Sequence, residues 1–355
     1  MSLKVVAWST GNAGKAAIAG IDARPELELV GVWVSNPDKV GKDAGELAGL
    51  GRTLGVPATD DADALLALKP DCIVHTAMAD NRLPDALADL RKFLAAGINV
   101  VSSGPVFLQY PYGVIPAELI TPIQQAAEDG GASLWVNGID PGWANDVLPL
   151  LVTSASERID EVRCYEIVDY STYNQREVVF DIMGFGRPLD DKPVLLMPGV
   201  LTMAWGSVVR QLAAALDVEL DEITETVDRR PAPDTFDISC GRIEAGTQAA
   251  LSFEVLGWRN GRTVVALEHV TRLRPDLAPD WPQPAGVSCY RVLVTGEPTY
   301  TLDLQFMGND GDHNTGGLKG TSMRLVNAIE AVVAAPPGLL TALDLPLFTG
   351  RGLVS

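Results

Sequence analysis

Four side chains that could carry acid–base chemistry lie in or after the motif NGIDPGW, residues 137–143. Asp140 comes directly before a Pro-Gly turn at the end of a strand-like run, and Glu166 and Tyr170 stand in the later run RCYEIVDYS. His269 lies between apolar residues in the run ALEHVTRL. Carboxylates and imidazoles exchange protons, and a phenol can donate to an oxygen that gains negative charge. These four residues are therefore the candidate catalytic residues.

Each candidate also has a structural alternative. Asp140 either faces a cleft or caps the helix that follows it. Alternation along RCYEIVDYS gives Glu166 one face of a strand. Glu166 is then either buried beside a cleft, with a raised pKa, or exposed and structural. Tyr170 either donates a hydrogen bond or forms part of a pocket wall, and His269 is either catalytic or an ordinary strand histidine.

Three residues of the same region are expected to border a substrate. Asn137 ends the strand-like run SLWVNGI, while Trp143 and Tyr173 lie close in sequence to Asp140 and Tyr170. Trp143 either closes a small apolar pocket or packs in the core. Tyr173 either donates to a carbonyl oxygen or lines the pocket.

The stretch VVAWSTGNAGKAA, residues 5–17, has the form of a turn that binds a dinucleotide. Such a turn needs a backbone that approaches the pyrophosphate closely and a helix whose free N–H groups meet its charge. Gly11 and Gly14 meet these needs, whereas Ser9 replaces the first glycine of the usual pattern, which is tolerable if its φ angle is negative. A tight turn with no ligand is the alternative. The residues expected to hold the pyrophosphate are Ser9, Thr10, Gly11, Asn12, Ala13 and Gly14.

The residues after the second strand bear on the choice between NAD and NADP. An acidic residue there would bind the ribose 2′-hydroxyl of NAD. The sequence reads VSNPDKVGK instead, so Ser35, Asn36 and Lys39 offer donors to a 2′-phosphate, and Asp38 is free to point outward. We expect NADP, with NAD possible, and the alternative is that Lys39 is merely solvated.

The elements that position these residues fall into two parts. Residues 1–145 alternate short β-branched runs with helical patterns, which predicts a doubly wound parallel sheet in an α/β fold. Residues 146–319 contain long alternating runs from 159 to 307, a helix over 201–216 and an Asn-Gly hairpin at 260–261, which predict a second, α+β domain with a mostly antiparallel sheet. Residues 320–355 are expected to pack back on the first domain. The loop MGNDGDHNTGGLKG, which holds His313, is expected to be a mobile lid.

Composition excludes several classes of partner. The net charge of −19 argues against nucleic acid and against an anionic membrane, and the longest apolar stretch is interrupted by prolines and acids. Four scattered cysteines form no CxxC pair, and three separated histidines form no metal cluster. We expect a cytoplasmic protein with a small-molecule substrate and no metal. A spare face of the second sheet favours a homodimer.

Several motifs together resemble a known family. They are WSTGNAGK, SNPDKVGKDAGEL, NVVSSGP, NGIDPGWANDVLP, EIVDYSTYN and AAPPGLLTALDLP. Across nearly the whole chain they are similar to the dihydrodipicolinate reductase-like oxidoreductases, in the branch of 2,4-diaminopentanoate dehydrogenase and the native amine dehydrogenases. The resemblance implies an N-terminal Rossmann domain that holds NAD(P)H and a second domain whose sheet covers the nicotinamide and often builds a dimer. It places these residues beside the nicotinamide ribose: Thr76, Ala77, Met78, Ser102, Ser103 and Gly104.

One departure from the family pattern concerns ammonia. The native amine dehydrogenases carry a glutamate soon after the SSGP turn, and the resemblance aligns Val106 with it in the substrate pocket. Valine cannot accept a proton, and the nearest carboxylate in sequence, Glu118, falls in a helix where it is expected to be solvated. The leading expectation is an NADP-dependent oxidoreductase that reductively aminates small ketones or aldehydes. The alternatives are a C=O or C=N reductase that uses no free ammonia, and a nucleotide-binding sensor without catalysis.

Overall fold

The computed structural model describes residues 2–79 and 82–354 and divides the chain into two compact units. Unit 1 comprises Met1–Ile139 and Leu318–Ser355, and unit 2 comprises Asp140–Gly317. The sequence had placed these boundaries after residues 145 and 319. None of the helices in the described ranges is both long and apolar enough to cross a lipid bilayer.

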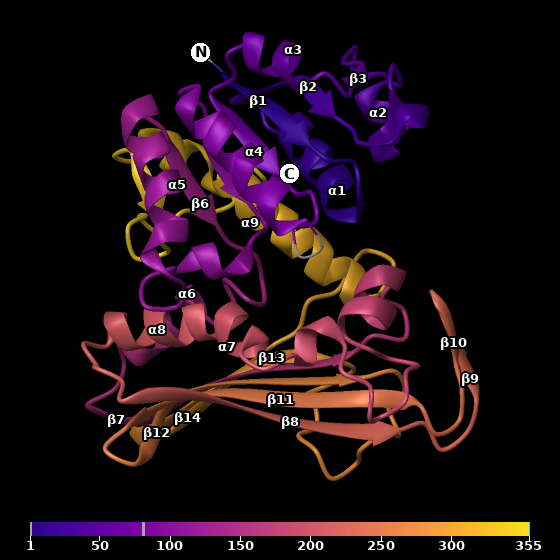
Figure 1. The fold of residues 1–355 in the computed structure, drawn as a ribbon, viewed down its shortest axis with the longest axis vertical. Coiled ribbons are helices and arrows are strands. Elements are labelled where there is room, and N and C mark those ends of the chain that lie inside the picture. The colour runs from indigo at the N-terminus through magenta and orange to yellow at the C-terminus, as the bar shows by residue number, and fades with distance from the viewer. Residues whose placement is uncertain (1, 80–81, 355) are drawn as a thin grey trace. The chain divides into compact units, whose positions relative to one another are not determined.

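Unit 1 is built on a seven-stranded sheet in the order β15-β6-β5-β4-β1-β2-β3, with every neighbouring pair parallel (Figure 1). This is the predicted doubly wound arrangement, in which helices cover the sheet. Its elements are β1 (Leu3–Trp8), α1 (Asn12–Asp22), β2 (Leu27–Trp33), η1 (Pro37–Lys39), α2 (Ala44–Ala48), β3 (Ala58–Thr59), α3 (Ala62–Ala67), β4 (Cys72–His75), α4 (Leu83–Ala95), β5 (Asn99–Ser102), η2 (Val106–Gln109), α5 (Ala117–Gly130), β6 (Ser133–Val136), most of α9 (His313–Ala334) and β15 (Gly338–Leu340).

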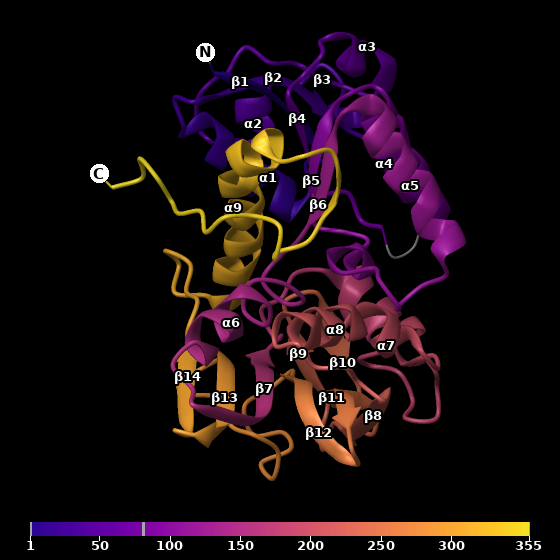
Figure 2. The ribbon, with the colours of Figure 1, turned by 90° about the vertical axis from the view of Figure 1, so that its left-hand side faces the viewer.

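The C-terminal helix completes the core of unit 1. Leu325 and Ile329 of α9 are fully buried and share a cluster with Ile18 of α1 and Val5 of β1. Figure 2 shows α9 alongside α1, although the two helices lie some 300 residues apart in sequence. The apolar stripe of α9 therefore has its partner surface within this unit, and the strand β15 that follows extends the sheet beyond β6.

Unit 2 is a six-stranded sheet in the order β14-β13-β7-β12-β11-β8. All its neighbouring pairs are antiparallel except β7 and β12, so the sheet is mixed but mostly antiparallel, as predicted. Helices α7 and α8 lie over one face (Figure 1). Its elements are α6 (Val147–Thr153), β7 (Arg158–Asp169), η3 (Glu177–Ile182), η4 (Val194–Leu196), α7 (Val200–Ala204), α8 (Gly206–Ala215), β8 (Glu222–Pro231), β9 (Phe236–Ile238), β10 (Gly241–Ile243), β11 (Gln248–Arg259), β12 (Arg262–Arg272), β13 (Cys289–Glu297) and β14 (Tyr300–Leu304).

Two local predictions meet different outcomes. The hairpin is confirmed: Asn260 and Gly261 join β11 to β12, and both have positive φ, as the tight turn between twisted strands requires. The predicted loop is wrong from His313 onward, because α9 begins there. The Nε2 of His313 lies 2.6 Å from the carbonyl oxygen of Asp169, and Asp312 accepts a hydrogen bond from the backbone N–H of Thr315. The loop is thereby fixed to the end of β7.

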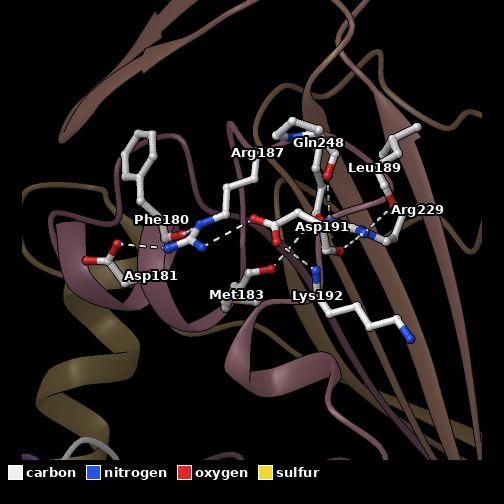
Figure 3. Close-up of polar contacts among 10 residues, drawn as sticks. Phe180, Asp181, Met183, Arg187, Leu189, Asp191, Lys192, Arg229 and Gln248 are labelled. Atoms are coloured by element: carbon white, nitrogen blue, oxygen red, sulfur yellow. Dashed lines mark hydrogen bonds and ion pairs between the residues drawn. The ribbon is translucent and has the colours of Figure 1, made fainter.

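Two arginines hold the long segment between β7 and α7 in place (Figure 3). Arg187 donates to the carbonyl of Phe180 at 2.8 Å and to the carboxylate of Asp191 at 3.3 Å. Arg229, on β8, donates to the carbonyls of Leu189 and Asp191 at 2.6 and 2.8 Å. Because one guanidinium can satisfy several carbonyls at once, a segment with little regular structure is tied to the sheet edge.

Candidate active site

The register of the second sheet brings one residue from each of four strands into a row. Phe253 on β11 pairs with His269 on β12, His269 pairs with Glu166 on β7, and Glu166 pairs with Tyr290 on β13. Directly paired residues of neighbouring strands lie side by side on the same face of a sheet. The row Phe253–His269–Glu166–Tyr290 thus places a carboxylate between an imidazole and a phenol.

Glu166 and His269 form a buried ion pair at the centre of this row. Oε2 of Glu166 and Nε2 of His269 are 2.5 Å apart, and each side chain is only 6% exposed. On its other side, Nδ1 of His269 lies 2.8 Å from Oγ1 of Thr271, and Glu166 also takes part in a hydrogen bond with Tyr290. The expectation that Glu166 is exposed is therefore wrong, and His269 has a charged partner.

The charged and polar groups of this row shift the pKa values of His269 and Tyr290. Burial by itself lowers the pKa of His269, but the carboxylates of Glu166 and Asp140 outweigh it, and the net shift is upward. Burial and the negative charge of Glu166 raise the pKa of Tyr290 well above its ordinary value. Tyr290 consequently stays protonated and donates its O–H to Glu166. The carboxylate of Glu166 thus lies between two donors, the imidazole of His269 and the phenol of Tyr290.

Asp140 is a second carboxylate beside the pair. Its Oδ1 accepts the indole N–H of Trp205 at 2.8 Å. Burial first, and then the charge of Glu166, raise the pKa of Asp140 to about 7, although His269 and the Trp205 hydrogen bond oppose the shift. The helix that follows is capped by Asp146, whose side chain accepts the N–H of Val147, so Asp140 does not act as the cap.

Aromatic rings surround the pair. Phe253 stacks on His269 with ring centroids 4.9 Å apart, and the edges of Trp205 and Tyr170 meet the same ring at 5.9 and 6.3 Å. Tyr173 stacks on Tyr170 at 4.5 Å. These apolar faces exclude water, which strengthens the electrostatic interaction between the buried charges. Unit 2 therefore brings Asp140, Glu166, Tyr170, Tyr173 and His269 together.

Trp143 is a further aromatic residue of unit 2. It is half-buried and meets Phe306 edge to face at 6.2 Å, and Phe306 in turn meets Tyr290 at 5.9 Å. The ring of Phe306 thus links Trp143 to the row. Within the described residues, no group of three or more His, Cys, Asp or Glu side chains could hold a metal ion.

In unit 1, the predicted cofactor loop joins β1 to α1. A Cβ atom at Gly14 would lie 2.2 Å from the backbone oxygen of Ser9 and 3.1 Å from Oγ1 of Thr76, so the backbone passes too close for any side chain. Gly11 is the N-cap residue of α1 and has no side chain to cap the first N–H groups of the helix, an arrangement that suits phosphate binding. The observed geometry therefore fits the pyrophosphate of a dinucleotide. Asn12 and Ala13 form the first turn of α1 beside it.

Ser9 does not meet the condition of a negative φ angle. Ser9 has a φ of 109°, a region that glycine enters freely and other residues rarely adopt. The Ser9 carbonyl has to pass directly over Gly14, and the positive φ accompanies this path. In compensation, Oγ of Ser9 accepts the backbone N–H of Gly11 at 3.3 Å. The serine therefore occupies a glycine-like conformation and also holds the loop.

Lys39 contacts this loop from η1, which follows β2. Its Nζ donates to Oγ1 of Thr10 at 3.1 Å and to the Thr10 carbonyl at 3.4 Å, so the merely solvated reading of Lys39 is wrong. Asn36 uses its side chain to cap η1 through the N–H of Asp38, and Ser35 is exposed. One ammonium thus lies between the predicted pyrophosphate loop and the predicted adenosine end.

The remaining predicted residues of unit 1 lie at the carboxyl ends of β4, β5 and β6. Ser102 donates to the carbonyl of Gly104 at 2.5 Å and contacts Nδ1 of the buried His75 at 2.9 Å. The backbone N–H of Asn137 donates to the Ser102 carbonyl at 3.0 Å, and Asn137 accepts a hydrogen bond from Arg324. Ala77, Met78 and Ser103 follow the same two strand ends, Val106 begins η2 and is half-buried, and Glu118 is exposed on α5.

Several residues of the two sites were missed from the sequence. Tyr290, Trp205 and His75 gave no local signal, because their partners lie on strands or turns far away in the chain. Thr271 could have been found, since it lies two residues from His269 in a strand and must share its face.

Comparison with known proteins agrees with this architecture. Residues 144–351 match the family model of the 2,4-diaminopentanoate dehydrogenase C-terminal domain, and residues 4–102 match that of the dihydrodipicolinate reductase N-terminus. An amine dehydrogenase from Streptomyces virginiae is 45% identical over 97% of this chain and 96% of its own length. The chain belongs to the amine dehydrogenase family. The resemblance inferred from the motifs is confirmed, and with it the class of NAD(P)-dependent oxidoreductases.

More distant relatives support the same fold for this amine dehydrogenase homologue. The 2,4-diaminopentanoate dehydrogenase of Acetoanaerobium sticklandii is 23% identical over 97% of this chain and 94% of its own. The solved amine dehydrogenase from Mycobacterium smegmatis covers 99% of this chain and 98% of its own, with a TM-score of 0.80 at 24% identity. The fold is also similar to that of the biliverdin reductase from Synechocystis solved in complex with biliverdin and NADP+. That match covers 92% of this chain and 90% of its own, with a TM-score of 0.51 at 12% identity.

Proposed function

We propose that this protein is an amine dehydrogenase that reductively aminates small, mainly apolar ketones or aldehydes and prefers NADPH. The observation that carries the proposal is the buried contact between Glu166 and His269, with Oε2 and Nε2 2.5 Å apart. Amination of a carbonyl requires a base that takes a proton from the attacking amine and an acid that protonates the departing oxygen. A carboxylate and an imidazolium in contact provide both.

The proposed roles follow from the protons that each group holds. Glu166 is the only one of the pair able to accept a proton while His269 is charged, so its carboxylate takes the proton from ammonium or from the bound amine. The Nε2–H of His269 donates to the Glu166 carboxylate and holds it in place, and Glu166 passes the proton that it took from the amine to the leaving hydroxyl. Tyr290 donates to Glu166 and orients it. NAD(P)H, when bound, supplies the hydride that reduces the C=N bond.

This proposal accounts for the valine in the SSGP region. The isopropyl group of Val106 cannot take part in proton transfer, and Glu118 is exposed on α5. The buried acid–base pair of unit 2 contains the proton-accepting group that Val106 lacks. Val106 nevertheless favours one competing function, the reduction of C=O or C=N bonds without free ammonia.

The preference for NADPH rests on Lys39. Its ammonium contacts Thr10 of the pyrophosphate loop, and no acidic residue occupies the position that binds the 2′-hydroxyl in NAD-specific enzymes. A 2′-phosphate carries negative charge that this lysine would attract.

We also propose a homodimer located in the cytoplasm. Arg163, Glu254 and Glu268 lie on the sheet face opposite the active-site row, because strand residues alternate between faces. Their side chains are only 11–30% exposed, and this face is the surface we expect to pair.

The decisive assay measures nicotinamide oxidation with a panel of small ketones and aldehydes, with and without ammonium, using NADPH and NADH in parallel. An amine dehydrogenase consumes NADPH only when ammonium is present and releases the corresponding amine. Ammonium-independent consumption would identify a carbonyl reductase instead. Tight NADPH binding without turnover of any substrate in the panel would favour the sensor.

A further inference from the structure

The nitrogen of His269 that faces away from Glu166 has its own partner. Nδ1 lies 2.8 Å from Oγ1 of Thr271, and Thr271 is fully buried. Both residues lie on β12, two positions apart, so they share a face of the sheet. A charged imidazolium has two N–H donors and no acceptor, and each buried donor needs an acceptor. Glu166 accepts the first, and the Thr271 hydroxyl is placed to accept the second.

We propose that Thr271 is a positioning residue whose hydroxyl oxygen accepts the Nδ1–H of His269 and thereby keeps the imidazole doubly protonated beside the carboxylate of Glu166. This inference rests on the proposed function, because it explains how Glu166 is kept ready to accept a proton. Thr271 acts through His269 and not on the substrate.

Two carboxylates near His269 also favour its charged form, and the neighbouring phenols stay neutral. The carboxylates of Glu166 and Asp140 raise the pKa of His269 against the opposing effect of burial. The phenol of Tyr170 meets the ring edge on, and Tyr290 faces Glu166 rather than the imidazole. Both phenols have raised pKa values and remain neutral. The charge of His269 is therefore set by two carboxylates, and Thr271 decides whether its second proton has an acceptor.

The alternative is a neutral His269 in which the hydroxyl of Thr271 donates to an unprotonated Nδ1. Geometry alone is compatible with either direction, because a hydroxyl can donate or accept. The two states differ in one measurable property, the number of protons on the imidazole.

Nitrogen NMR of the full-length protein, labelled with ¹⁵N-histidine, distinguishes the two states. The chain has three histidines, and a His269→Gln variant assigns the His269 signals. We expect both ring nitrogens of His269 to be protonated at neutral pH in the wild type. In Thr271→Val, which keeps the shape but not the oxygen, the deprotonation midpoint should fall by about 1–2 pH units, the equivalent of one lost charge-assisted hydrogen bond. Thr271→Ser restores the oxygen and should restore the midpoint.

The same variants are then compared in a pH profile of kcat/KM for amination. The high-pH limb should move down in Thr271→Val and return in Thr271→Ser, while NADPH affinity stays unchanged in both. A singly protonated His269 in the wild type, or equal midpoints in the wild type and Thr271→Val, would overturn the inference. If Thr271→Val does not fold, Thr271→Ala serves in its place. Because the NMR measurement needs no turnover, failure of amination would reject the proposed function while leaving this result intact.

Discussion

Replacing Ser9 tests the cofactor loop, because two effects of this residue oppose each other. Its φ of 109° costs a residue with a side chain about 1–3 kcal/mol, which glycine would not incur. Its hydroxyl accepts the N–H of Gly11 at 3.3 Å, and because this hydrogen bond is exposed, it contributes about 0.5–1 kcal/mol to stability. Ser9→Ala removes the hydrogen bond and keeps the strain. Ser9→Gly removes both, but the greater freedom of glycine in the unfolded chain costs about 0.4–1 kcal/mol.

These magnitudes predict an order of stabilities. The free energy of unfolding of Ser9→Gly should be close to that of the wild type, and that of Ser9→Ala should be about 0.5–1 kcal/mol lower. Chemical denaturation of the three proteins in the absence of cofactor measures the difference, and NADPH titration of each reports whether the loop still binds. If Ser9→Ala proves more stable than Ser9→Gly, the strained conformation of Ser9 is refuted, and the explanation of its path over Gly14 is refuted with it.

Two further predictions concern charge. Lys39→Ala should weaken NADPH binding roughly 10-fold or more, because a charge-assisted contact is lost, and should leave NADH binding nearly unchanged. Substitution of the exposed Lys42 by alanine is the control. Equal losses of affinity for both cofactors in Lys39→Ala would contradict the NADP preference. Asp140→Asn should change the pH dependence of stability. The pKa of Asp140 is about 7 in the folded protein and about 3.9 in the unfolded chain, so the folded wild type holds an extra proton between these values and loses stability as pH rises. Denaturation at about pH 5.5 and about pH 8 should show the asparagine variant losing less stability than the wild type, by roughly 1–2 kcal/mol after allowance for solvent screening. An equal loss in both proteins would show that Asp140 does not titrate in this range.

The parts of this fold that depend on neighbouring residues were predictable. Alternation identified the strand around Glu166, and the Asn260-Gly261 pair identified its hairpin, because both signals are local. The N-terminus of α9 also has a local signal, the carboxylate of Asp312 three residues before Thr315, which was misread as part of a flexible loop.

The active-site row could not be predicted in the same way. Its members come from four strands whose register is set by the whole sheet, so nothing near Glu166 in the sequence points to His269 or Tyr290. The conformation of Ser9 is likewise imposed by the approach of its backbone to Gly14. Long-range packing therefore decides the chemistry that the local patterns leave open.

A double-variant cycle on the active-site pair tests the central claim most directly. Amination kcat/KM is measured for the wild type, Glu166→Gln, His269→Gln and the double variant, with folding checked by thermal denaturation. Groups that move one proton together lose their function together, so each single variant should be slower by roughly 10²–10⁴-fold and the double variant little slower than the worse single. Losses that multiply in the double variant, or an unchanged rate in Glu166→Gln, would contradict the account.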